Sequence, residues 1–310
     1  MRVFVTGGAG FIGSYVCEIL LQNGAEVVAF DDFSTGQNRI DGAEIVEGDV
    51  RNFDEVISAM AGCTHIAHLA AMASVPASVA NPALSEAINL QGTLNVIEAA
   101  HQVGVKRIVF SSTAAVYGNA TELPVTESTV TQCQSPYAED KLAAEVAILH
   151  SGIEAISLRY FNVHGPRQDP NGAYAAVIPV FIQMLMDKKS PTIFGTGEAT
   201  RDFVSVFDVA ELNLMALTTE NEAALGEVYN VASGSTMSVL ELFTTLRELL
   251  SSKELEVQTV EPVFAPPRGG DILHSSASIV KARELLGFDP ETNPSLALSA
   301  TVEAYWVEQA

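Results

Sequence analysis

Short apolar runs alternate with amphipathic segments through the first half of the chain. The amphipathic segments predict helices over residues 12–23, 53–61, 84–103 and 136–150. The apolar runs between them predict strands at residues 3–5, 26–30, 45–47, 65–69, 107–110 and 155–158. Apolar strands that alternate with helices are typical of a parallel sheet covered on both faces. Right-handed crossovers then give an α/β fold with a doubly wound, Rossmann-type parallel sheet.

The regular alternation ends near residue 165, where Gly and Pro become more frequent. This change predicts a smaller, mixed α/β domain in the C-terminal half of the chain. The run 228–231 looks like one more strand of the central sheet, so the domain boundary should be discontinuous. We expect a first domain of residues 1–165 and 203–233, and a second domain of residues 166–202 and 234–310.

The composition favours a folded protein of a reducing compartment, because hydrophobic residues make up 48% of the 310 positions. No apolar run approaches the roughly 20 residues of a membrane span. The first strand begins too early to leave room for a signal peptide, so a cytoplasmic protein is expected. Cys17, Cys63 and Cys133 are scattered, which predicts free thiols. The six histidines show no ligand spacing, and no metal site is expected.

The net charge of −22 arises from 38 acidic and 16 basic residues. Such a surface should repel nucleic acid and anionic membranes, and neither is expected as a partner. Adaptation to a salty habitat is an open alternative explanation of this charge. An anionic substrate would require the few arginines to gather where that substrate binds.

A glycine-rich turn follows the first predicted strand and opens the first predicted helix. Glycines 7, 10 and 13 permit a tight turn and the close approach of a diphosphate to the helix N-terminus. Asp31 and Asp32 end the second strand, where an acid meets the ribose hydroxyls of a dinucleotide. A carboxylate repels a 2′-phosphate, so NAD is favoured over NADP. Arg39 is the residue that leaves NADP open, its alternative role being a solvated loop charge.

Hydroxyl groups and a lysine gather at the predicted carboxyl edge of the sheet. Thr113 follows the strand at 107–110, and Tyr137 and Lys141 are four residues apart on one face of a predicted helix. An ammonium group beside a phenol favours the phenolate, so Lys141 is expected to lower the pKa of Tyr137. With NAD, these groups suit alcohol–ketone redox chemistry, in which hydride leaves a carbinol carbon and the proton goes to the tyrosine.

Ordered motifs along almost the whole chain carry a family resemblance. They lie at residues 6–13, 31–36, 48–50, 68–71, 89–93, 111–118, 135–137, 159–167, 201–204 and 229–232. Together they resemble the extended short-chain dehydrogenase/reductase superfamily and, within it, the UDP-glucose 4-epimerase family of sugar-nucleotide epimerases. Chance agreement across all of these motifs is negligible.

The resemblance implies roles for individual residues, with Thr113, Tyr137 and Lys141 as the catalytic group. The first domain would bind NAD through Gly7, Gly10, Phe11, Ile12, Gly13, Asp31, Asp32, Ser34, Thr35, Gly36, Asp49, Val50, Leu69, Ala70, Ala71, Asn89, Ser111, Tyr137, Lys141 and Tyr160. The second domain would bind the UDP-sugar, together with residues of the first, through Ser74, Thr113, Asn162, Val177, Thr192, Phe194, Arg201, Arg268, Asp271 and Ser275.

Within that set, Arg201 and Arg268 would clamp the substrate diphosphate and Phe194 would lie in the uridine pocket. Surface ion pairs are the alternative for the two arginines, and core packing is the alternative for Phe194. Two arginines at matching positions would give a local positive pocket for a diphosphate despite the acidic exterior.

The implied activity is 4-epimerisation of UDP-hexoses through a 4-keto intermediate, with tightly bound NAD and no net redox change. Ala114 and Ala115 follow Thr113, where related 4,6-dehydratases carry Asp-Glu and UDP-glucuronate decarboxylases carry a Glu at the second position. Plain epimerisation is therefore expected. Ser275 occupies the position that limits sugar size in the family, which predicts turnover of UDP-N-acetylglucosamine and its galacto epimer beside UDP-glucose and UDP-galactose.

Three alternatives to this activity stay open. They are a UDP-glucuronate 4-epimerase, a reductase of 4-keto sugar nucleotides, and a non-catalytic NAD-sensing regulator. The resemblance also implies a homodimer built from the helices near residues 84–103 and 136–150. Apolar positions in these helices suit such an interface and equally suit packing on the sheet; they are Leu90, Leu94, Ile97, Leu142, Val146 and Leu149.

Overall fold

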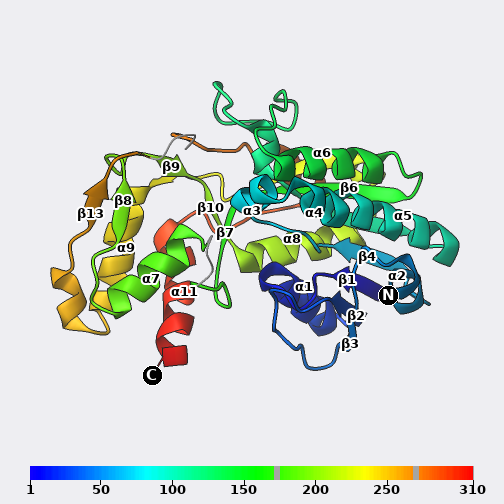
Figure 1. Ribbon diagram of the computed structural model, residues 1–310, viewed down its shortest axis with the longest axis horizontal. Helices are drawn as coiled ribbons and strands as arrows, with labels where there is room; N and C mark the ends of the chain where they lie inside the picture. The colour runs from blue at the N-terminus through cyan, green and yellow to red at the C-terminus, as the bar shows by residue number, and fades with distance from the viewer. Residues whose placement is uncertain (171–174, 268–271, 310) are drawn as a thin grey trace.

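The structure of the protein, a computed structural model, describes residues 1–170, 175–267 and 272–309 (Figure 1). Its main feature is a seven-stranded sheet in the order β11-β6-β5-β4-β1-β2-β3. Every neighbouring pair of strands is parallel, which confirms the predicted doubly wound fold. The strands are β1 (Arg2–Thr6), β2 (Glu26–Asp31), β3 (Glu44–Glu47), β4 (His65–His68), β5 (Arg107–Thr113), β6 (Glu154–Tyr160) and β11 (Glu227–Val231).

The strand order reverses between β1 and β4, and at such a switch point the carboxyl ends of the strands open a crevice for ligands. Helices cover both faces of the sheet because successive strand residues point to opposite sides. Val3 and Val5 of β1 enter one hydrophobic cluster, whereas Phe4 enters the other.

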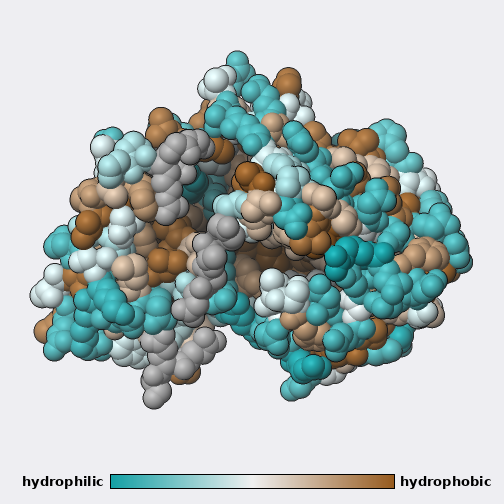
Figure 2. Space-filling model, viewed as in Figure 1, coloured by the Kyte–Doolittle hydropathy of each residue, from teal (hydrophilic) through white to brown (hydrophobic). Residues whose placement is uncertain are grey.

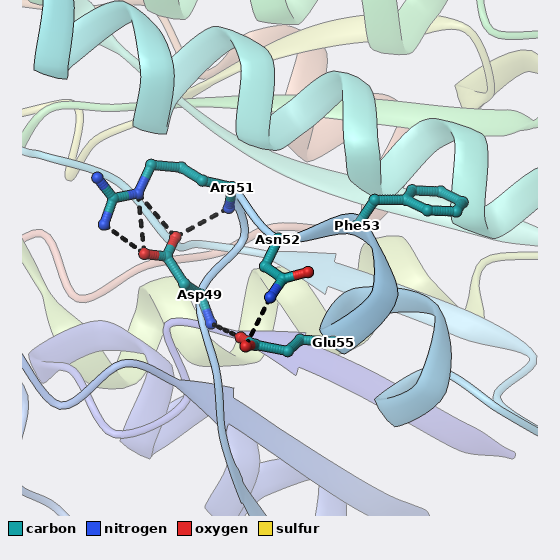
Figure 3. Close-up of a pocket in the computed structure, with 5 residues that line it drawn as sticks. All are labelled: Asp49, Arg51, Asn52, Phe53 and Glu55. Carbon is teal, nitrogen blue, oxygen red and sulfur yellow. Dashed lines mark hydrogen bonds and ion pairs between the residues drawn. The ribbon is translucent and has the colours of Figure 1, made fainter.

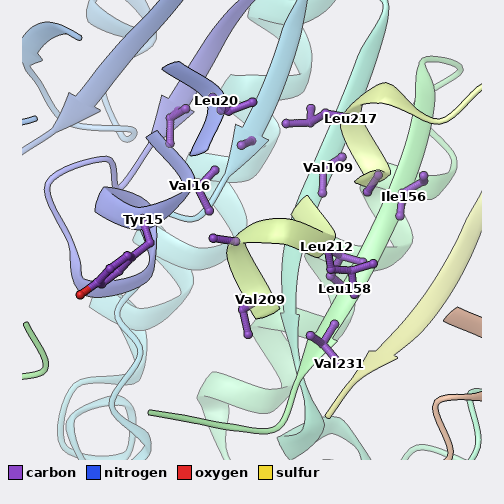
Figure 4. Packing of buried hydrophobic residues seen from close by; sticks show 14 of the residues in the cluster. Tyr15, Val16, Leu20, Val109, Ile156, Leu158, Val209, Leu212, Leu217 and Val231 are labelled. Carbon is purple, nitrogen blue, oxygen red and sulfur yellow. The ribbon is translucent and has the colours of Figure 1, made fainter. Parts of the chain in front are cut away.

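The first face of the sheet is covered by α1 (Phe11–Gln22) and α8 (Val206–Thr218), which pack against each other. Figure 4 shows this cluster, in which side chains of both helices meet the strands; the labelled residues are Tyr15, Val16, Leu20, Val109, Ile156, Leu158, Val209, Leu212, Leu217 and Val231. The second face is covered by α2 (Phe53–Ala59), α5 (Gly92–Val103) and α6 (Pro136–Leu149).

The C-terminal part has its own hydrophobic cluster, built by α7 (Val177–Met186), α9 (Val239–Ser251) and α11 (Pro294–Gln309). Three pairs of short strands accompany these helices. They are β7 (Asn162–His164) with β10 (Phe203–Ser205), β8 (Thr192–Phe194) with β13 (Val263–Ala265), and β9 (Thr200–Arg201) with β12 (Met237–Ser238). Figure 1 shows this part beside the sheet domain.

Two details differ from the segments predicted from the sequence. The predicted helix at 84–103 is divided into α4 (Pro82–Glu86), a π-helical turn η1 (Ala87–Gln91) and α5. The helix α10 (Val280–Leu286) packs on β11 and α8 of the sheet domain, whereas the predicted boundary places it in the second domain. The predicted strand at 228–231 is confirmed as β11.

The apolar positions predicted for a subunit interface divide into two kinds. Leu94 on α5 and Val146 on α6 are exposed, at 38% and 49%. The other four are partly buried and pack against the hydrophobic clusters; they are Leu90, Ile97, Leu142 and Leu149. The homodimer thus stays a prediction. Among the described residues, none of the helices combines the length and the apolar character that crossing a bilayer requires.

A buried ion pair fixes α6 to the sheet. Arg159 of β6 donates from Nη2 to Glu145 Oε1 at 2.6 Å and from Nε to Glu145 Oε2 at 3.1 Å. Ser157 Oγ donates to the same carboxylate at 3.0 Å. Because both charged side chains are almost fully buried, the pair is satisfied only while both partners are present.

Arg159→Met should therefore leave Glu145 as an unpaired buried charge. We expect the free energy of unfolding to fall by about 3–5 kcal/mol, as for other buried pairs broken on one side. Urea unfolding followed by circular dichroism measures this change. Arg283→Met, at an exposed pair with Asp289, is the control and should cost less than about 1 kcal/mol. An equal loss of unfolding free energy in the two variants would contradict the view that the buried Arg159–Glu145 pair fixes α6 to the sheet.

Candidate active site

The glycine turn lies between β1 and α1, directly against the segment that follows β4. Gly7 has φ +69°, and a Cβ at this position would lie 2.8 Å from Ala70 N. A Cβ at Gly13 would collide with the carbonyl of Gly7, so the helix can approach the turn only without it. Gly10 is the N-cap residue of α1 and makes no side-chain cap. The first N–H groups of α1 are thereby suited to a phosphate.

Asp31 holds this turn in place from the end of β2. Its Oδ2 accepts from Ala9 N and its Oδ1 accepts from Phe33 N, both at 2.9 Å. Burial raises the pKa of Asp31, and these backbone N–H groups oppose that rise. Asp31 therefore shapes the glycine turn besides lying where ribose hydroxyls are expected.

The loop after β2 carries the other acidic and hydroxyl residues predicted to bind NAD. Asp32, Ser34 and Thr35 are exposed, and Ser34 Oγ donates to Asp32 Oδ1 at 2.6 Å. The Arg39 guanidinium lies 4.8 Å from the centroid of the Phe33 ring. Arg39 is thus exposed and stacked on its own loop, which fits the loop-charge alternative.

Asp49, predicted to bind NAD, lies in an open pocket with Arg51, Asn52, Phe53 and Glu55 (Figure 3). Arg51 donates hydrogen bonds from Nε and Nη2 to the Asp49 carboxylate, with an Nε–Oδ2 distance of 2.8 Å. The Arg51 guanidinium lowers the pKa of Asp49. Glu55 Oε2 accepts from Asp49 N at 2.9 Å, which fixes the backbone here. Sequence reasoning missed Arg51.

Thr113, Tyr137 and Lys141 come together from two elements, as predicted. Thr113 ends β5 and Tyr137 lies in the first turn of α6, and their side chains are close enough for Thr113 to influence the pKa of Tyr137. Ser135 caps α6 by accepting from Ala138 N at 3.3 Å. Ser78 Oγ accepts from Tyr137 N at 3.1 Å, which fixes the start of the helix.

The predicted effect of Lys141 on the pKa of Tyr137 is wrong in this structure. Burial raises the pKa of Tyr137, and the Thr113 side chain only partly opposes this rise. Burial also lowers the pKa of Lys141 to about 7, while Glu145 raises it. The lysine Nζ lies 4.2 Å from the centroid of the Phe110 ring. Spacing on a helix gives proximity but does not reveal that both groups are desolvated.

His68, which the sequence analysis assigned no role, joins β1 to α5 inside the sheet domain. Its Nδ1 lies 2.6 Å from Thr6 Oγ1 and its Nε2 lies 2.9 Å from Thr93 Oγ1. Thr93 Oγ1 donates its proton to Asn89 O at 2.7 Å, so it accepts from His68 Nε2–H. Thr6 then donates to Nδ1, and its oxygen accepts from the N–H groups of Leu69 and Ala70. The bonds are consistent only with a neutral ring that carries its proton on Nε2.

Asn89 holds the far end of the segment after β4, at Met72, whereas Thr6 holds Leu69 and Ala70. Its Oδ1 accepts from Met72 N at 2.8 Å, and Nδ2 donates to Met72 O at 3.4 Å and Ser85 Oγ at 3.2 Å. Asn89 is 1% exposed, and both amide N–H groups are donated within the described part of the chain. This geometry gives Asn89 a supporting position, and its direct contact with NAD stays a prediction.

The remaining residues predicted for the NAD site fall into two groups. Tyr160 is buried on the α8 face, where its hydroxyl bonds to Asn213, and half-buried Ser111 lies on the neighbouring strand β5. It packs in the core cluster there, which sequence reasoning did not predict. The others are buried or half-buried around the glycine turn and the carboxyl ends of the strands; they are Phe11, Ile12, Gly36, Val50, Leu69, Ala70 and Ala71.

Several residues predicted for the UDP-sugar gather around β9. Thr200 O accepts from Ser275 N at 3.1 Å, which holds half-buried Ser275 beside Arg201. Asn162 lies in β7, and its Nδ2 donates to Asp202 O at 3.0 Å. The fold thus brings together Asn162, Arg201 and Ser275. Figure 2 shows that the surface is hollowed between the C-terminal part and the sheet domain.

Other predicted substrate residues are more widely spread. Thr192 and Phe194 lie on β8, where the Phe194 side chain is 37% exposed and therefore not in the core. Val177 begins α7, and Ser74 caps α3 (Val75–Ala80) by accepting from Ala77 N at 3.2 Å. Arg268 and Asp271 lie outside the described residues.

The protonation of His68 gives a pH-dependent prediction. Burial lowers its pKa from 6.5 to about 3, so the unfolded chain takes up a proton between these values and the folded protein does not. We expect this histidine to contribute stability above pH 6.5 and to lose that contribution as the pH falls toward 3.

Two-dimensional ¹H–¹⁵N spectra of the histidine rings test this assignment directly. We expect the His68 ring to keep the neutral Nε2–H pattern from pH 8 to pH 5, with exposed His101 and His150 as solvated references. A His68 signal that changes to the imidazolium pattern in this range would contradict the hydrogen-bond assignment.

Comparison with known proteins agrees with this arrangement. The model of a family described as NAD dependent epimerase/dehydratase matches residues 3–232. A UDP-glucose 4-epimerase of Mycolicibacterium smegmatis is 35% identical over 318 residues, covering 98% of each chain. The solved UDP-glucose 4-epimerase of Thermotoga maritima, a complex with UDP-glucose, has a TM-score of 0.93, 35% identity and full coverage of both chains.

A UDP-N-acetylglucosamine 4-epimerase of Methanobrevibacter ruminantium, solved with UDP-N-acetylmuramic acid, is also similar. Its TM-score is 0.91 at 34% identity, and the match covers 100% of this chain and 99% of that one. The family match covers most of the chain and includes the glycine turn, Thr113, Tyr137 and Lys141. The resemblance seen in the motifs is thereby confirmed, and the chain belongs to the NAD dependent epimerase/dehydratase family.

Proposed function

We propose that the protein is an isomerase that catalyses NAD-dependent 4-epimerisation of UDP-hexoses through a 4-keto intermediate. The observation that carries this proposal is the proximity of the Thr113 and Tyr137 side chains at the carboxyl edge of the sheet, with Lys141 one helical turn away. Ala114 and Ala115 begin the 3₁₀ turn after Thr113 and bring no acid or base. The site is therefore equipped to move one proton and not to eliminate water.

NAD is the cofactor of this family, and when bound it supplies the acceptor and donor of hydride. The residues present fit it, because the glycine turn leaves no room for a Cβ and the N-terminus of α1 has no side-chain cap. Gly10 and the first turn of α1 would hold the diphosphate, and Asp31 would hold the adenosine ribose.

The protein's own groups bind and orient the sugar and exchange its hydroxyl proton. Thr113 and Tyr137 together would hold the C4 hydroxyl, and Tyr137 would take its proton as hydride leaves C4. Lys141, with a pKa lowered to about 7, is close to balance between its charged and neutral forms at neutral pH. The 4-keto sugar would then turn over about its diphosphate link and be reduced on the opposite face.

Arg201 and Asn162 are proposed to bind the substrate diphosphate. This would keep the diphosphate in place while the keto sugar rotates. The two residues lie on adjoining segments, since Asn162 of β7 is bonded to Asp202, the residue after Arg201. Arg201 Nη1 donates to Thr200 O at 2.9 Å, which positions its guanidinium beside β9. A guanidinium held in this way can bind an anion with little loss of side-chain freedom.

Tyr137→Phe tests the proposed base. We expect the rate of UDP-galactose to UDP-glucose conversion to fall by about 10²–10⁴-fold, the range for general acid–base groups, with bound NAD retained. Tyr229→Phe, which removes a buried hydroxyl bonded to Ala224 O, is the matched control and should stay within about twofold. A panel assay of UDP-sugars by NMR gives both rates. Full activity of Tyr137→Phe would sink the proposed role.

Ser275 gives a separate prediction on sugar choice. A small side chain beside β9 supports space for an N-acetyl group, and the N-acetylated pair of UDP-sugars is the proposed additional substrate. Ser275→Tyr should lower kcat/KM for UDP-N-acetylglucosamine by about tenfold or more while UDP-galactose changes little, because an added ring excludes the larger group. If the unmodified enzyme converts no N-acetylated UDP-sugar, the proposed role of Ser275 is wrong. UDP-glucuronate in the same panel tests the alternative that the protein is a UDP-glucuronate 4-epimerase.

A further inference from the structure

A buried chain of hydrogen bonds links the catalytic helix to the segment after β4. It starts at Asp140, which lies on α6 between Tyr137 and Lys141. Ser85 of α4 donates from Oγ to Asp140 Oδ2 at 2.6 Å. Ser85 is 0% and Asp140 9% exposed. The distance is that of a hydroxyl bonded to a carboxylate, one of the stronger side-chain hydrogen bonds.

The direction of the next bonds follows from the number of hydrogens. The single hydroxyl hydrogen of Ser85 is used on Asp140, so Ser85 Oγ accepts from Asn89 Nδ2 at 3.2 Å. Asn89 Oδ1 in turn accepts from Met72 N at 2.8 Å. The chain therefore runs from the backbone of Met72 through Asn89 and Ser85 to Asp140.

A second arm fixes the other end of the same segment. Asn89 O accepts from Thr93, which is bonded to His68, and His68 is bonded to Thr6. The Thr6 hydroxyl oxygen accepts from Leu69 N at 3.2 Å and from Ala70 N at 3.1 Å. The backbone of residues 69–72 is thus held at both ends, against the glycine turn and against the catalytic helix.

The helix that carries these groups is irregular where Asn89 lies. Residues Ala87–Gln91 form a π-helical turn between α4 and α5, and both Ser85 and Thr93 on its two sides bond to Asn89. Single π-helical turns inside α-helices often mark functional positions, because the extra residue changes which side chains share a face. Here the turn lies at the branching point of the network.

We propose that Ser85, Asn89 and Asp140 are positioning residues that hold Tyr137 and Lys141 in register with residues 69–72. The role rests on the proposed epimerase function, because those residues adjoin the glycine turn where the nicotinamide cofactor is expected to bind. None of the three needs to touch the substrate. The link sets the separation between the proton-transfer groups and the hydride path, on which transfer rates depend steeply.

Ser85→Ala cuts the link at its centre and is the first test. We expect kcat for UDP-galactose to fall about tenfold or more, with KM within about twofold, because binding groups are untouched. With UDP-galactose deuterated at C4, the isotope effect on kcat should rise above that of the unmodified enzyme, since hydride transfer becomes rate-limiting. A loss of stability alone would lower the apparent kcat by reducing the folded fraction, but it would leave the isotope effect unchanged.

A readout that does not depend on activity is hydrogen exchange at the Met72 amide. We expect exchange to accelerate about tenfold or more in Ser85→Ala, because Asn89 loses its anchor. Asp140→Asn retains an oxygen that can accept from Ser85 and should keep most of kcat and of the amide protection, whereas Asp140→Ala should lose both. Ser85→Cys is a second variant of similar size if Ser85→Ala folds poorly.

Thr301→Val is the matched control, because it removes a buried hydroxyl bonded to His164 at 3.1 Å in the C-terminal part. It should leave kcat, the isotope effect and Met72 exchange unchanged. Unaltered kcat, isotope effect and exchange in Ser85→Ala would overturn the positioning role while the epimerase stands. An unmodified protein that converts no UDP-sugar would instead overturn the proposed function itself.

Discussion

The close contact between the end of β1 and the segment after β4 determines how the rest of the site is built. Gly7 makes this contact possible, because any Cβ there would lie 2.8 Å from Ala70 N. The hydroxyl of Thr6 then bonds the backbone of the same segment and a neutral, buried His68. Backbone packing and hydrogen bonds thereby hold the two strand ends together at the switch point of the sheet.

The electrostatics of the catalytic group follow from where the fold places it. Burial works against charge on both members of the pair, raising the pKa of Tyr137 and lowering that of Lys141 to about 7. The nearby Thr113 side chain partly opposes the rise at Tyr137, and the carboxylate of Glu145, which is itself held by Arg159, partly opposes the fall at Lys141. The helix α6 thus carries the proposed reacting phenol and, about two turns further along, the carboxylate of the ion pair that fixes the helix to the sheet.

Much of the fold could be predicted from the sequence because it depends on local patterns. Apolar strands alternating with amphipathic helices indicate the parallel sheet, and the glycine spacing with Asp31 indicates a dinucleotide turn. The meeting of Thr113 with Tyr137 also follows from strand-end position and helical spacing. The position of α10 on the sheet domain could not be predicted this way, because it depends on which surface is free after the chain has folded.

The features that the sequence did not predict all depend on tertiary packing. Desolvation of Tyr137 and Lys141 is invisible in a spacing of four, and so the expected direction of the tyrosine pKa was wrong. The Ser85–Asp140 bond joins residues 55 apart, which no periodicity reports. The π-helical turn at Asn89 has the same apolar pattern as an ordinary helix. Arg268 and Asp271 were predicted from the resemblance alone and lie outside the described residues.

In the proposed reaction, one site removes a hydride from C4 and returns the same hydride to the opposite face. The most direct measurement follows UDP-galactose carrying deuterium at C4 through conversion in ordinary water, with no cofactor added. The account predicts UDP-glucose that retains deuterium at C4, because the hydride never leaves the site and Tyr137 exchanges only the hydroxyl proton. UDP-glucose with the deuterium replaced by solvent hydrogen would contradict it.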